Sequence, residues 1–377
     1  LASKPQKPVE DTGPVDAEPA VPAKASMGDV LDLDDIHVEF APDLVDMVLD
    51  PGTGLDARIA NMRSHVATDF GVLLPEIRLT DNAALPPGTY VVHVQGVEQV
   101  RDNLQATKVL ALMNDGDDGG LQGEQVSEPV YGAPARWIDP QDQENAALAG
   151  LTTVQPTEVL ATHLLEIVKR NFPRLLTFKA LRRRLDEMVN LSDAERAEAN
   201  RRMLDELIPD KVPIDVLLSV LRLLLEERVS IRNLPLIIEA TAEGRQLHPS
   251  ADGIAEHVRQ RLGFQLVAKM RRADGTIPLV QLAPEWEDTF NTYEIRTERG
   301  SGDVALPPDS FNALADGIAE KLGQAADAGA YAAVVTSTKR RRFLRTVMAA
   351  KGIMNPVLSF EEIGIDARPA LVGLVAQ

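Results

Sequence analysis

The sequence predicts a multidomain protein of mixed α+β and α/β class, in which four small subdomains follow a proline-rich linker. The chain has 377 residues, and this length gives a prior of about two to four domains. Apolar residues repeat at strand-like spacing early in the chain, at helical spacing in the middle, and in alternating strand and helix segments at the end. Aromatic residues make up only 4% of the chain, so the cores must consist mainly of Leu, Val, Ile and Ala.

Residues 1–45 are predicted to be a linker. The first part of this segment has no apolar periodicity and contains Pro5, Pro8, Pro14, Pro19 and Pro22. A segment of this kind does not bury enough apolar surface to offset the entropy lost on ordering. The chain begins without Met and without the apolar core of a signal peptide, so we expect it to be a piece of a longer protein. No run of about 18 apolar residues occurs, and we therefore predict no membrane-spanning helix in this chain.

Residues 46–151, together with 209–228, are predicted to form the first subdomain, of α+β type. Its helix ends at Gly71 and carries one apolar face, made by Ile59, Met62, Val66 and Phe70. Three β-rich segments follow, each bounded by Pro, Gly or Asn, at 76–82, 88–96 and 108–114. Before this subdomain, residues 36–40 alternate apolar and polar side chains, which favours one further strand.

Residues 152–208 are predicted to form a second, helix-rich subdomain. Apolar residues take helical spacing from Pro156 onward, and Ser192 and Glu195 have the spacing of a capping box. The following helix starts at Pro213, and its residues 216–225 are nearly all apolar, so it is expected to be deeply buried.

The third and fourth subdomains are predicted to differ in class. Residues 229–300 are predicted to be mostly α-helical. Residues 301–377 begin in a hinge rich in Gly and Pro and then alternate helix and strand, which is typical of a small α/β unit with a sheet.

The joint between two helices at residues 229–233 contains Val229 and Ile231, although a turn needs only polar, flexible residues. Two interpretations are open. Either the joint is packed between subdomains and Arg232 caps a carbonyl or pairs with an acid, or the joint forms a surface that another chain covers. Both predict a short, rigid connector, because Asn233 and Pro235 are typical residues at helix starts.

The sequence contains no local signature of an active site, a metal site or a cofactor site. It has no cysteine, which excludes disulfides and thiolate chemistry, and the spacing of its six histidines matches no local zinc motif. The acidic loop that starts at Asp115 fails as an EF-hand, because Gly119 and Val126 occupy two ligand positions. No phosphate-binding glycine motif or nucleophile motif is present. We therefore expect no enzyme activity, no metal and no cofactor.

A nucleic-acid-binding regulator is the alternative function that the residues leave open. A helix with Arg182, Arg183 and Arg184 on its surface would be its reading element, and a second basic cluster lies at residues 339–345. The formal net charge of −18 disfavours affinity for nucleic acid and anionic lipid. Acidic residues also lie close in the sequence to Arg182, Arg183 and Arg184. Together with the net charge, they favour a solvent-exposed surface or a contact between subunits for each cluster, and we expect no nucleic-acid partner.

Three segments, in this order, resemble the cytoplasmic part of the type III secretion export-gate family, also called FHIPEP: “PTEVLATHLLEIVKRN” at 156–171, “LLLEERVSIRNLPLIIEA” at 223–240 and “PVLSFEEI” at 356–363. The segment “EPVYGAPARWI” at 128–138 supports the resemblance, which covers about residues 45–377. This family has a flagellar and an injectisome branch, and the flagellar branch is favoured here.

The resemblance implies a docking platform that binds export chaperones with their substrates and contributes to ordered protein secretion. It also implies other export-apparatus proteins as partners, a nine-membered ring of identical subunits and no ATPase activity of its own. The family's members carry an N-terminal membrane domain, so the resemblance places this part at the cytoplasmic face of the bacterial inner membrane.

The resemblance further implies a hydrophobic chaperone-binding groove between the first two subdomains. Flagellar relatives tend to carry an acid, a Phe and a Thr there, and this sequence departs from those types. A chaperone helix is expected to lie in the groove with its apolar face inward, and the groove is predicted to consist of Pro173, Leu175, Leu176, Phe178, Ile214, Asp215 and Val216. Contacts between subdomains or ring subunits are predicted for Phe40, Val229, Ile231, Arg232 and Asn233, and the alternative for Phe40 is an edge strand within its own chain.

Overall fold

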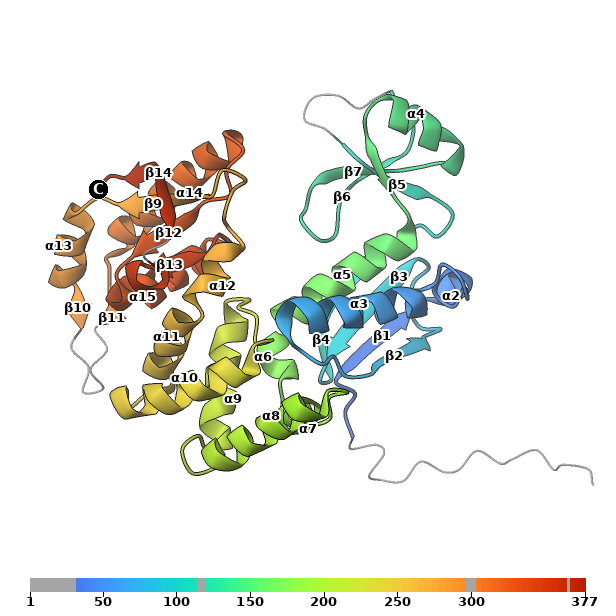
Figure 1. Ribbon diagram of the computed structural model, residues 1–377. Helices are drawn as coiled ribbons and strands as arrows, with labels where there is room; N and C mark the ends of the chain where they lie inside the picture. The colour runs from blue at the N-terminus through green and yellow to red at the C-terminus, as the bar shows by residue number, and fades with distance from the viewer. Residues whose placement is uncertain (1–31, 114–119, 296–302, 365–366) are drawn as a thin grey trace, which may run out of the picture.

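The computed structural model describes residues 32–113, 120–295, 303–364 and 367–377, and it confirms the predicted fold class. Figure 1 shows a U-shaped molecule, in which helices form the base, a small β-sheet unit forms one arm and a C-terminal α/β unit forms the other arm. Within the described ranges, no helix is long and apolar enough to cross a bilayer.

The first unit is a four-stranded sheet with two helices on one face. The strand order is β2-β1-β3-β4, and β1 runs parallel to β2 and antiparallel to β3. The strands are β1 (Ile36–Phe40), β2 (Ile77–Asp81), β3 (Thr89–Val94) and β4 (Val97–Asn103). The helices α3 (Leu55–Phe70) and α5 (Pro156–Arg170) pack against each other and on the buried face. The short helices η1 (Pro42–Leu44) and α2 (Val45–Val48) connect β1 to α3.

The linker predicted for residues 1–45 therefore includes a core element. Side chains alternate along a strand, and in β1 this alternation places Ile36, Val38 and Phe40 in the core. Phe40 is only 2% exposed, so its side chain is not available for the predicted contact with a neighbouring ring subunit. The alternative, a strand within its own chain, describes Phe40 correctly, except that β1 is an inner strand and not an edge strand. Residues 1–31 of the predicted linker lie outside the described residues.

The second unit is a small sheet with a core of its own. The strand order is β6-β7-β5-β8, and the elements are β5 (Val109–Leu112), β6 (Glu124–Ser127), β7 (Pro134–Ile138), η2 (Pro140–Asp142), α4 (Gln143–Leu148) and β8 (Thr152–Val154). The separate core of this unit is built around Val109, Ile138 and Leu151.

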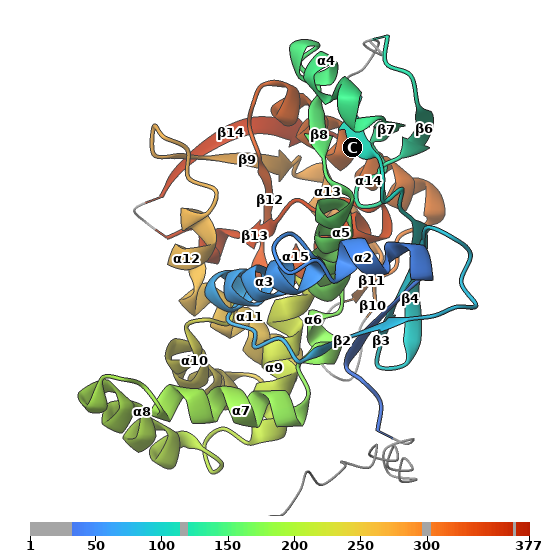
Figure 2. The ribbon, with the colours of Figure 1, turned by 90° about the vertical axis from the view of Figure 1, so that its right-hand side faces the viewer.

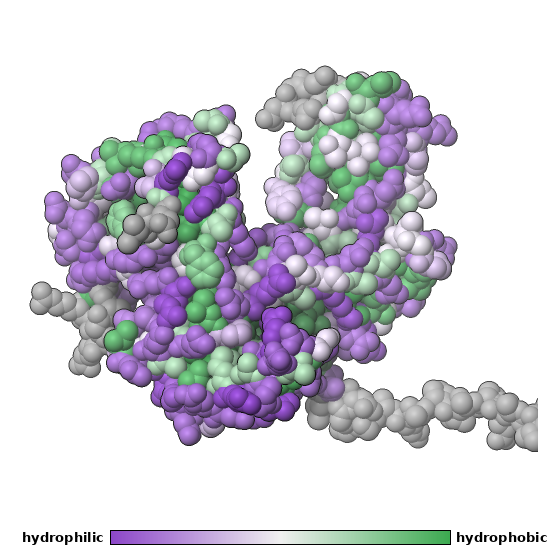
Figure 3. Space-filling model, viewed as in Figure 1, coloured by the Kyte–Doolittle hydropathy of each residue, from purple (hydrophilic) through white to green (hydrophobic). Residues whose placement is uncertain are grey.

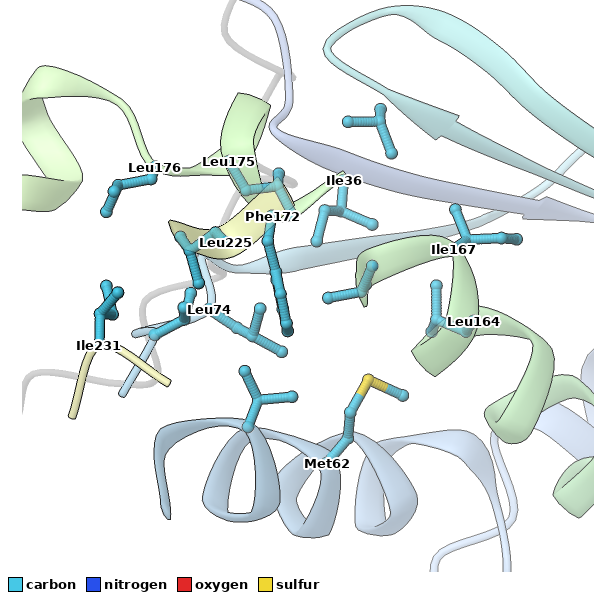
Figure 4. Packing of buried hydrophobic residues seen from close by; sticks show 14 of the residues in the cluster. Ile36, Met62, Leu74, Leu164, Ile167, Phe172, Leu175, Leu176, Leu225 and Ile231 are labelled. Carbon is cyan, nitrogen blue, oxygen red and sulfur yellow. The ribbon is translucent and has the colours of Figure 1, made fainter. Parts of the chain in front are cut away.

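The base of the U consists of helices that share one core with the first unit. The helices are α6 (Phe172–Leu175), α7 (Phe178–Val189), α8 (Ala194–Leu207), α9 (Ile214–Glu226), α10 (Leu234–Leu247), α11 (Ala251–Arg261) and α12 (Gly263–Ala268). Figure 4 shows Phe172 between side chains from the sheet, from α3 and from the helices of the base. Figure 2 shows α7 and α8 as a hairpin that projects from this base.

The C-terminal unit is a parallel sheet with helices on both faces. The strand order is β13-β12-β9-β14, and every neighbouring pair is parallel. One face packs on α13, α14 and α15, and the other face packs on α12 and η3. The elements are β9 (Thr276–Leu282), α13 (Glu285–Thr292), β10 (Glu294–Ile295), β11 (Asp303–Val304), α14 (Pro308–Asp327), β12 (Ala333–Thr336), α15 (Thr338–Ala350), β13 (Val357–Ser359), η3 (Phe360–Glu362) and β14 (Arg368–Val375).

The units differ from the predicted subdomains at their boundaries. Residues 109–113 and 120–151, predicted for subdomain 1, form a separate second unit with residues 152–154, predicted for subdomain 2, because among the described strands β5 pairs only with β7 and β8. The helix α5, predicted for subdomain 2 (152–208), packs on α3 of the first unit, and α9, predicted for subdomain 1 (209–228), packs on α6 and α11. The strand β9, predicted for subdomain 3 (229–300), lies inside the C-terminal sheet, so the fourth unit begins before residue 301.

Candidate functional site

The joint at residues 229–233 is packed into the core through its two apolar residues. Ile231 is 1% exposed and Val229 is also buried. The Ile231 amide donates to the Phe70 carbonyl at 2.8 Å, and the Val229 amide donates to the Leu224 carbonyl at 2.9 Å. These contacts fit the first interpretation of the joint for Val229 and Ile231, while Arg232 stays exposed and Asn233 is half-buried.

The end of α3 touches the joint so closely that only glycine fits. Gly71 has φ +73°, and a Cβ atom added to it would lie 2.5 Å from the Arg232 Cα atom. Arg184 donates from Nε to the Gly71 carbonyl at 3.2 Å and from Nη2 to the Arg232 carbonyl at 3.3 Å. The joint is thus clamped from both sides, which makes it a rigid connector.

Replacing Gly71 by alanine is expected to destabilise the protein by about 1–3 kcal/mol, because the new Cβ is strained at positive φ and meets the Arg232 backbone. Urea unfolding measures this loss. Gly150 is a matched control, since it also has φ +73° but no atom within 4 Å of an added Cβ. Equal losses for Gly71→Ala and Gly150→Ala would show that the joint is not tightly packed.

A cleft of about 970 Å³ lies beside the joint. Its walls come from the end of α3, the joint, α11, α12 and the C-terminal unit, and it lies at the base of the U (Figure 1). Figure 3 shows the molecule hollowed between the two arms. Apolar lining groups include Val229, Leu262, Leu266, Met354 and Val357, and polar lining groups include Arg228, Arg232, Asn233, Tyr331 and Arg345. The cleft can therefore hold an amphipathic segment.

Two exposed tyrosines, one on each arm, lie within electrostatic reach of Arg228. Tyr131, in the β6–β7 loop, is 75% exposed, and Tyr331, which lines the cleft, is 60% exposed. Partial burial raises the pKa of both phenols, and the positive charge of Arg228 acts on each of them in the opposite direction. Arg228 therefore lies within electrostatic reach of a residue on each arm of the U.

The loop that carries Tyr131 is held by a buried carboxylate. The side chain of Glu128 is buried and accepts hydrogen bonds from the amides of Val130 at 2.9 Å and Tyr131 at 2.7 Å. These bonds fix the backbone of the loop, so Tyr131 is presented to solvent from a rigid turn.

A buried ionic network lies next to the cleft and joins the base to the C-terminal unit. Arg341 at the start of α15 is fully buried, and its guanidinium donates to Glu227 at 2.6 and 2.8 Å and to Glu256 at 2.6 Å. Arg259 on α11 pairs with Glu227 at 3.2 Å and with Glu362 at 2.7 Å. The network therefore connects the end of α9, α11, α15 and η3 around the joint.

Acid is expected to weaken this network. Burial alone would raise the pKa of Glu227, but the charges of Arg259 and Arg341 and the hydrogen bond from Arg341 outweigh it and lower this pKa from 4.5 to about 2. A carboxyl group whose pKa is lower in the folded state stabilises the fold above its unfolded pKa, and this contribution is lost as the pH falls towards the folded pKa. The free energy of unfolding should therefore decline between about pH 4.5 and about pH 2. Urea titrations at several pH values test this, and an equally steep decline in Glu227→Gln would contradict it.

The structure does not bring the predicted groove residues together into one groove. Leu175 and Leu176 are buried in the shared core, Pro173 and Ile214 are half-buried, and Phe178 is exposed under the guanidinium of Arg182, 4.9 Å from its ring centroid. Asp215 and Val216 line a separate pocket of about 290 Å³ with residues of α10 and α11. The predicted groove was placed between the first unit and the α7–α8 helices, which were predicted as the second subdomain. In the structure the second unit is the β5–β8 sheet, so the predicted residues do not lie between the first two units.

The basic clusters do not form a uniform basic surface. Among Arg182, Arg183 and Arg184, the last is turned inward to the joint and the first stacks on Phe178. In the second cluster, Arg340 and Arg341 are fully buried in ion pairs, so the expected solvated or intersubunit face is wrong for these two residues. The nucleic-acid alternative therefore gains no support from the structure.

Sequence reasoning missed Tyr131, Tyr331 and the ionic network. Tyr131 lies within the quoted segment at 128–138, but its exposure depends on a turn that no periodicity reveals. Arg341 and Glu227 are 114 residues apart in sequence, so no local spacing relates them.

The model of the FHIPEP family matches residues 2–368. The chain is 32% identical over 363 residues to the flagellar biosynthesis protein FlhA of Caulobacter vibrioides, a match that covers 95% of this chain and 50% of that protein. It is 26% identical over 351 residues to FlhA of Bacillus subtilis, and this match covers 93% of this chain and 50% of that protein. The chain thus spans about half the length of these curated relatives.

Solved structures share the fold. The CdsV protein of Chlamydia pneumoniae superimposes with a TM-score of 0.75 at 22% identity, covering 94% of this chain and 99% of that chain. The cytosolic domain of EscV from a type III secretion system gives a TM-score of 0.68 at 18% identity, covering 91% of this chain and 97% of that chain. The match of the family model over nearly the whole sequence confirms the predicted resemblance, and the chain belongs to the FHIPEP family.

Proposed function

We propose that this chain is a docking platform of a flagellar-type protein export gate, which binds export chaperones with their substrates and acts by binding rather than by catalysis. The observation that carries the proposal is the cleft of about 970 Å³ at the base of the U, with Arg228 and the exposed Tyr331 in its lining and the exposed Tyr131 on the opposite arm within electrostatic reach of Arg228. Family membership supplies the context, since the relatives at full length are flagellar biosynthesis proteins by name.

The chemistry of the surface suits an amphipathic helix of a chaperone. Tyrosine offers a large, rigid side chain with a polar end, and such side chains often dominate binding energy at interfaces. The apolar floor, with Val229 and Met354, would accept the apolar face of the helix, and Arg228 and Arg345 would pair with its acidic groups. The junction between the first two units, where the family resemblance implies the chaperone groove, then lies at the loop of Tyr131.

A ring of identical subunits would strengthen such a contact. The EscV domain with the same fold is described as nonameric, and the CdsV protein has been solved in a complex with the CdsO protein. In our proposal this chain also forms a nine-membered ring at the cytoplasmic face of the inner membrane and contacts other export-apparatus proteins. Repetition of a weak site in one ring raises the overall avidity by orders of magnitude. Analytical ultracentrifugation of the chain over a range of concentrations tests the ring.

The docking site is tested by calorimetric titration of the chain with a purified flagellar chaperone–substrate complex. Tyr131→Ala and Tyr331→Ala are each expected to weaken binding by about tenfold or more, because each removes a rigid aromatic anchor. Leu148→Ala is the matched control, since Leu148 is exposed on α4 of the same arm as Tyr131, away from the cleft (Figure 1), and it should bind as the wild type does.

Two outcomes would overturn the proposal. Unchanged affinity in Tyr131→Ala, Tyr331→Ala and Met354→Ala would show that the partner binds elsewhere. Failure of the wild-type chain to bind any flagellar chaperone complex, both as free chain and when fused to a ring-forming carrier, would refute docking itself.

A further inference from the structure

We propose that His37, Glu39 and His93 bind a divalent transition-metal ion of the zinc class on the open face of the first sheet. One ligand atom from each of the three side chains lies within 4.8 Å of the other two, and all three side chains are half-buried. This site lies outside the cleft and the proposed docking surface, and it does not depend on the proposed function.

Strand pairing brings the three side chains together. His37 on β1 lies directly opposite His93 on β3 in the antiparallel ladder, and Glu39 follows two residues later on the same face of β1. The other face of β1 is fixed in the core by Ile36 and Val38, so the sheet cannot slip by one residue without exposing the core. The three candidate ligands are therefore held on paired strands whose register is fixed by the core.

Neighbouring side chains orient the candidate ligands. The Nε2 atom of His37 is 2.7 Å from the Thr80 hydroxyl oxygen, and Nδ1 of His37 is 3.8 Å from Oε1 of Glu39. When Nε2–H donates to Thr80, Nδ1 carries the free lone pair that a metal needs, and it faces the carboxylate. Asn82 donates from Nδ2 to the other oxygen of Glu39 at 2.8 Å. Outer hydrogen bonds of this kind are what metal-binding His and Glu side chains usually have.

His93 supplies a further observation that favours a ligand. Its Nδ1 atom is buried and has no hydrogen-bond partner among the described residues, and buried polar nitrogen atoms usually have a partner. The rings of His37 and His93 stack with centroids 5.9 Å apart, so small rotations of the two rings aim both at one point. Nearby, Arg78 is paired with Asp34 at 3.1 Å, which reduces the repulsion that its charge would exert on a cation.

The ligand set selects the class of ion. Two imidazoles and one carboxylate suit zinc and its neighbours in the transition series better than calcium or magnesium, which prefer oxygen ligands. Tetrahedral zinc with bonds of about 2.0–2.1 Å needs donor atoms about 3.4 Å apart, so the gap between His37 and Glu39 has to close by only a few tenths of an ångström. Three protein ligands leave one position for water or for a side chain from another chain.

The test is a titration of the metal-free chain with Zn²⁺ in competition with a chromophoric chelator, repeated with Co²⁺ to read the coordination geometry from its visible absorption. We expect one ion per chain and the intense absorption of tetrahedral Co²⁺. His93→Ala and Glu39→Gln should each weaken binding by more than about 100-fold, and Thr80→Val by about 10-fold, since outer partners contribute less than ligands. His65→Ala is the matched control, because His65 pairs with Asp69 on the surface of α3 and should leave binding unchanged.

Three results would overturn the proposal: no saturable binding of Zn²⁺ or Co²⁺ by the wild-type chain, equal affinity in Glu39→Gln and wild type, or equal loss in His65→Ala and His93→Ala. Glu39→Gln keeps the size of the side chain and its oxygen acceptor for Asn82, so it separates loss of a ligand from loss of folding. Circular dichroism of each variant without metal completes that separation.

Discussion

Arg341→Met is expected to lower the free energy of unfolding by about 3–5 kcal/mol, because it removes the partner of Glu256 and leaves Glu227 with Arg259 alone. Arg341 is fully buried, and its two partners, Glu227 and Glu256, have side chains that are only 16% and 13% exposed. Urea unfolding followed by circular dichroism measures the loss. Arg342→Met is the matched control, since Arg342 is exposed and its ion pair with Asp252 is at the surface, where such pairs contribute about 0–1 kcal/mol.

A compensating variant separates charge from packing. Replacing Glu256 by glutamine in the Arg341→Met background removes the carboxylate that has lost its partner, while Glu227 keeps its pair with Arg259, so the double variant should recover part of the lost stability. If Arg341→Met costs no more than Arg342→Met, the network does not hold the C-terminal unit on the base.

Phe172→Ala is expected to destabilise the protein by about 3–5 kcal/mol, through the lost burial and the cavity that remains. Phe172 is fully buried in the core shared by the first unit and the base (Figure 4), and its ring lies 5.0 Å from that of Phe70 at an angle of 56°. Because α3, α6 and the sheet meet at this ring, the first unit and the base should still unfold in one transition, at a lower urea concentration.

Phe178→Ala is the control for this prediction. Phe178 is six residues further along the chain and is 46% exposed, so its replacement should cost less than about 1 kcal/mol. Two separate transitions in the Phe172→Ala variant, one for the first unit and one for the helices, would contradict the shared core.

The periodicity of the sequence predicted the helices well and the partners of the strands poorly. The end of α3 at Gly71 follows from a local rule for left-handed caps and was predicted correctly. The start of α8 was predicted one residue early: Asp193, not Ser192, is the N-cap and accepts hydrogen bonds from the amides of Glu195 and Arg196. Both residue types cap helices well, so the sequence alone does not choose between them.

Strand pairing depends on contacts that are distant in the sequence. The strand β9 was placed with the helices before it, although its neighbours β12 and β14 follow it by dozens of residues. The same reason explains why no metal site was expected: His37 and His93 are far apart in the chain and meet only when β1 pairs with β3. The buried pairing of Arg340 and Arg341 was missed because arginine is mostly exposed in proteins, and here acids from three other helices surround the pair.

The candidate site was predictable only in part. The apolar residues of the joint pointed to a packed connector, because Val and Ile in a turn need an apolar environment. The exposure of Tyr131 and the cleft itself depend on how the units are arranged, which no single segment encodes. The predicted groove residues do not gather in one groove because the boundary between the first two units was placed at residue 152, whereas the second unit begins at β5 (Val109–Leu112).

The small sheet of β5–β8 is an insertion in the chain. Its first and last strands pair with each other, with Leu110 opposite Val154, so the backbone enters and leaves the unit at one place. One face of the unit has a core of its own, while the other face packs into the shared core through Leu110, Ala135 and Trp137. Such a module can change in length at the loops and helix on its outer side without moving the strands beneath it, while the side chains that reach the shared core, Leu110, Ala135 and Trp137, have to stay apolar.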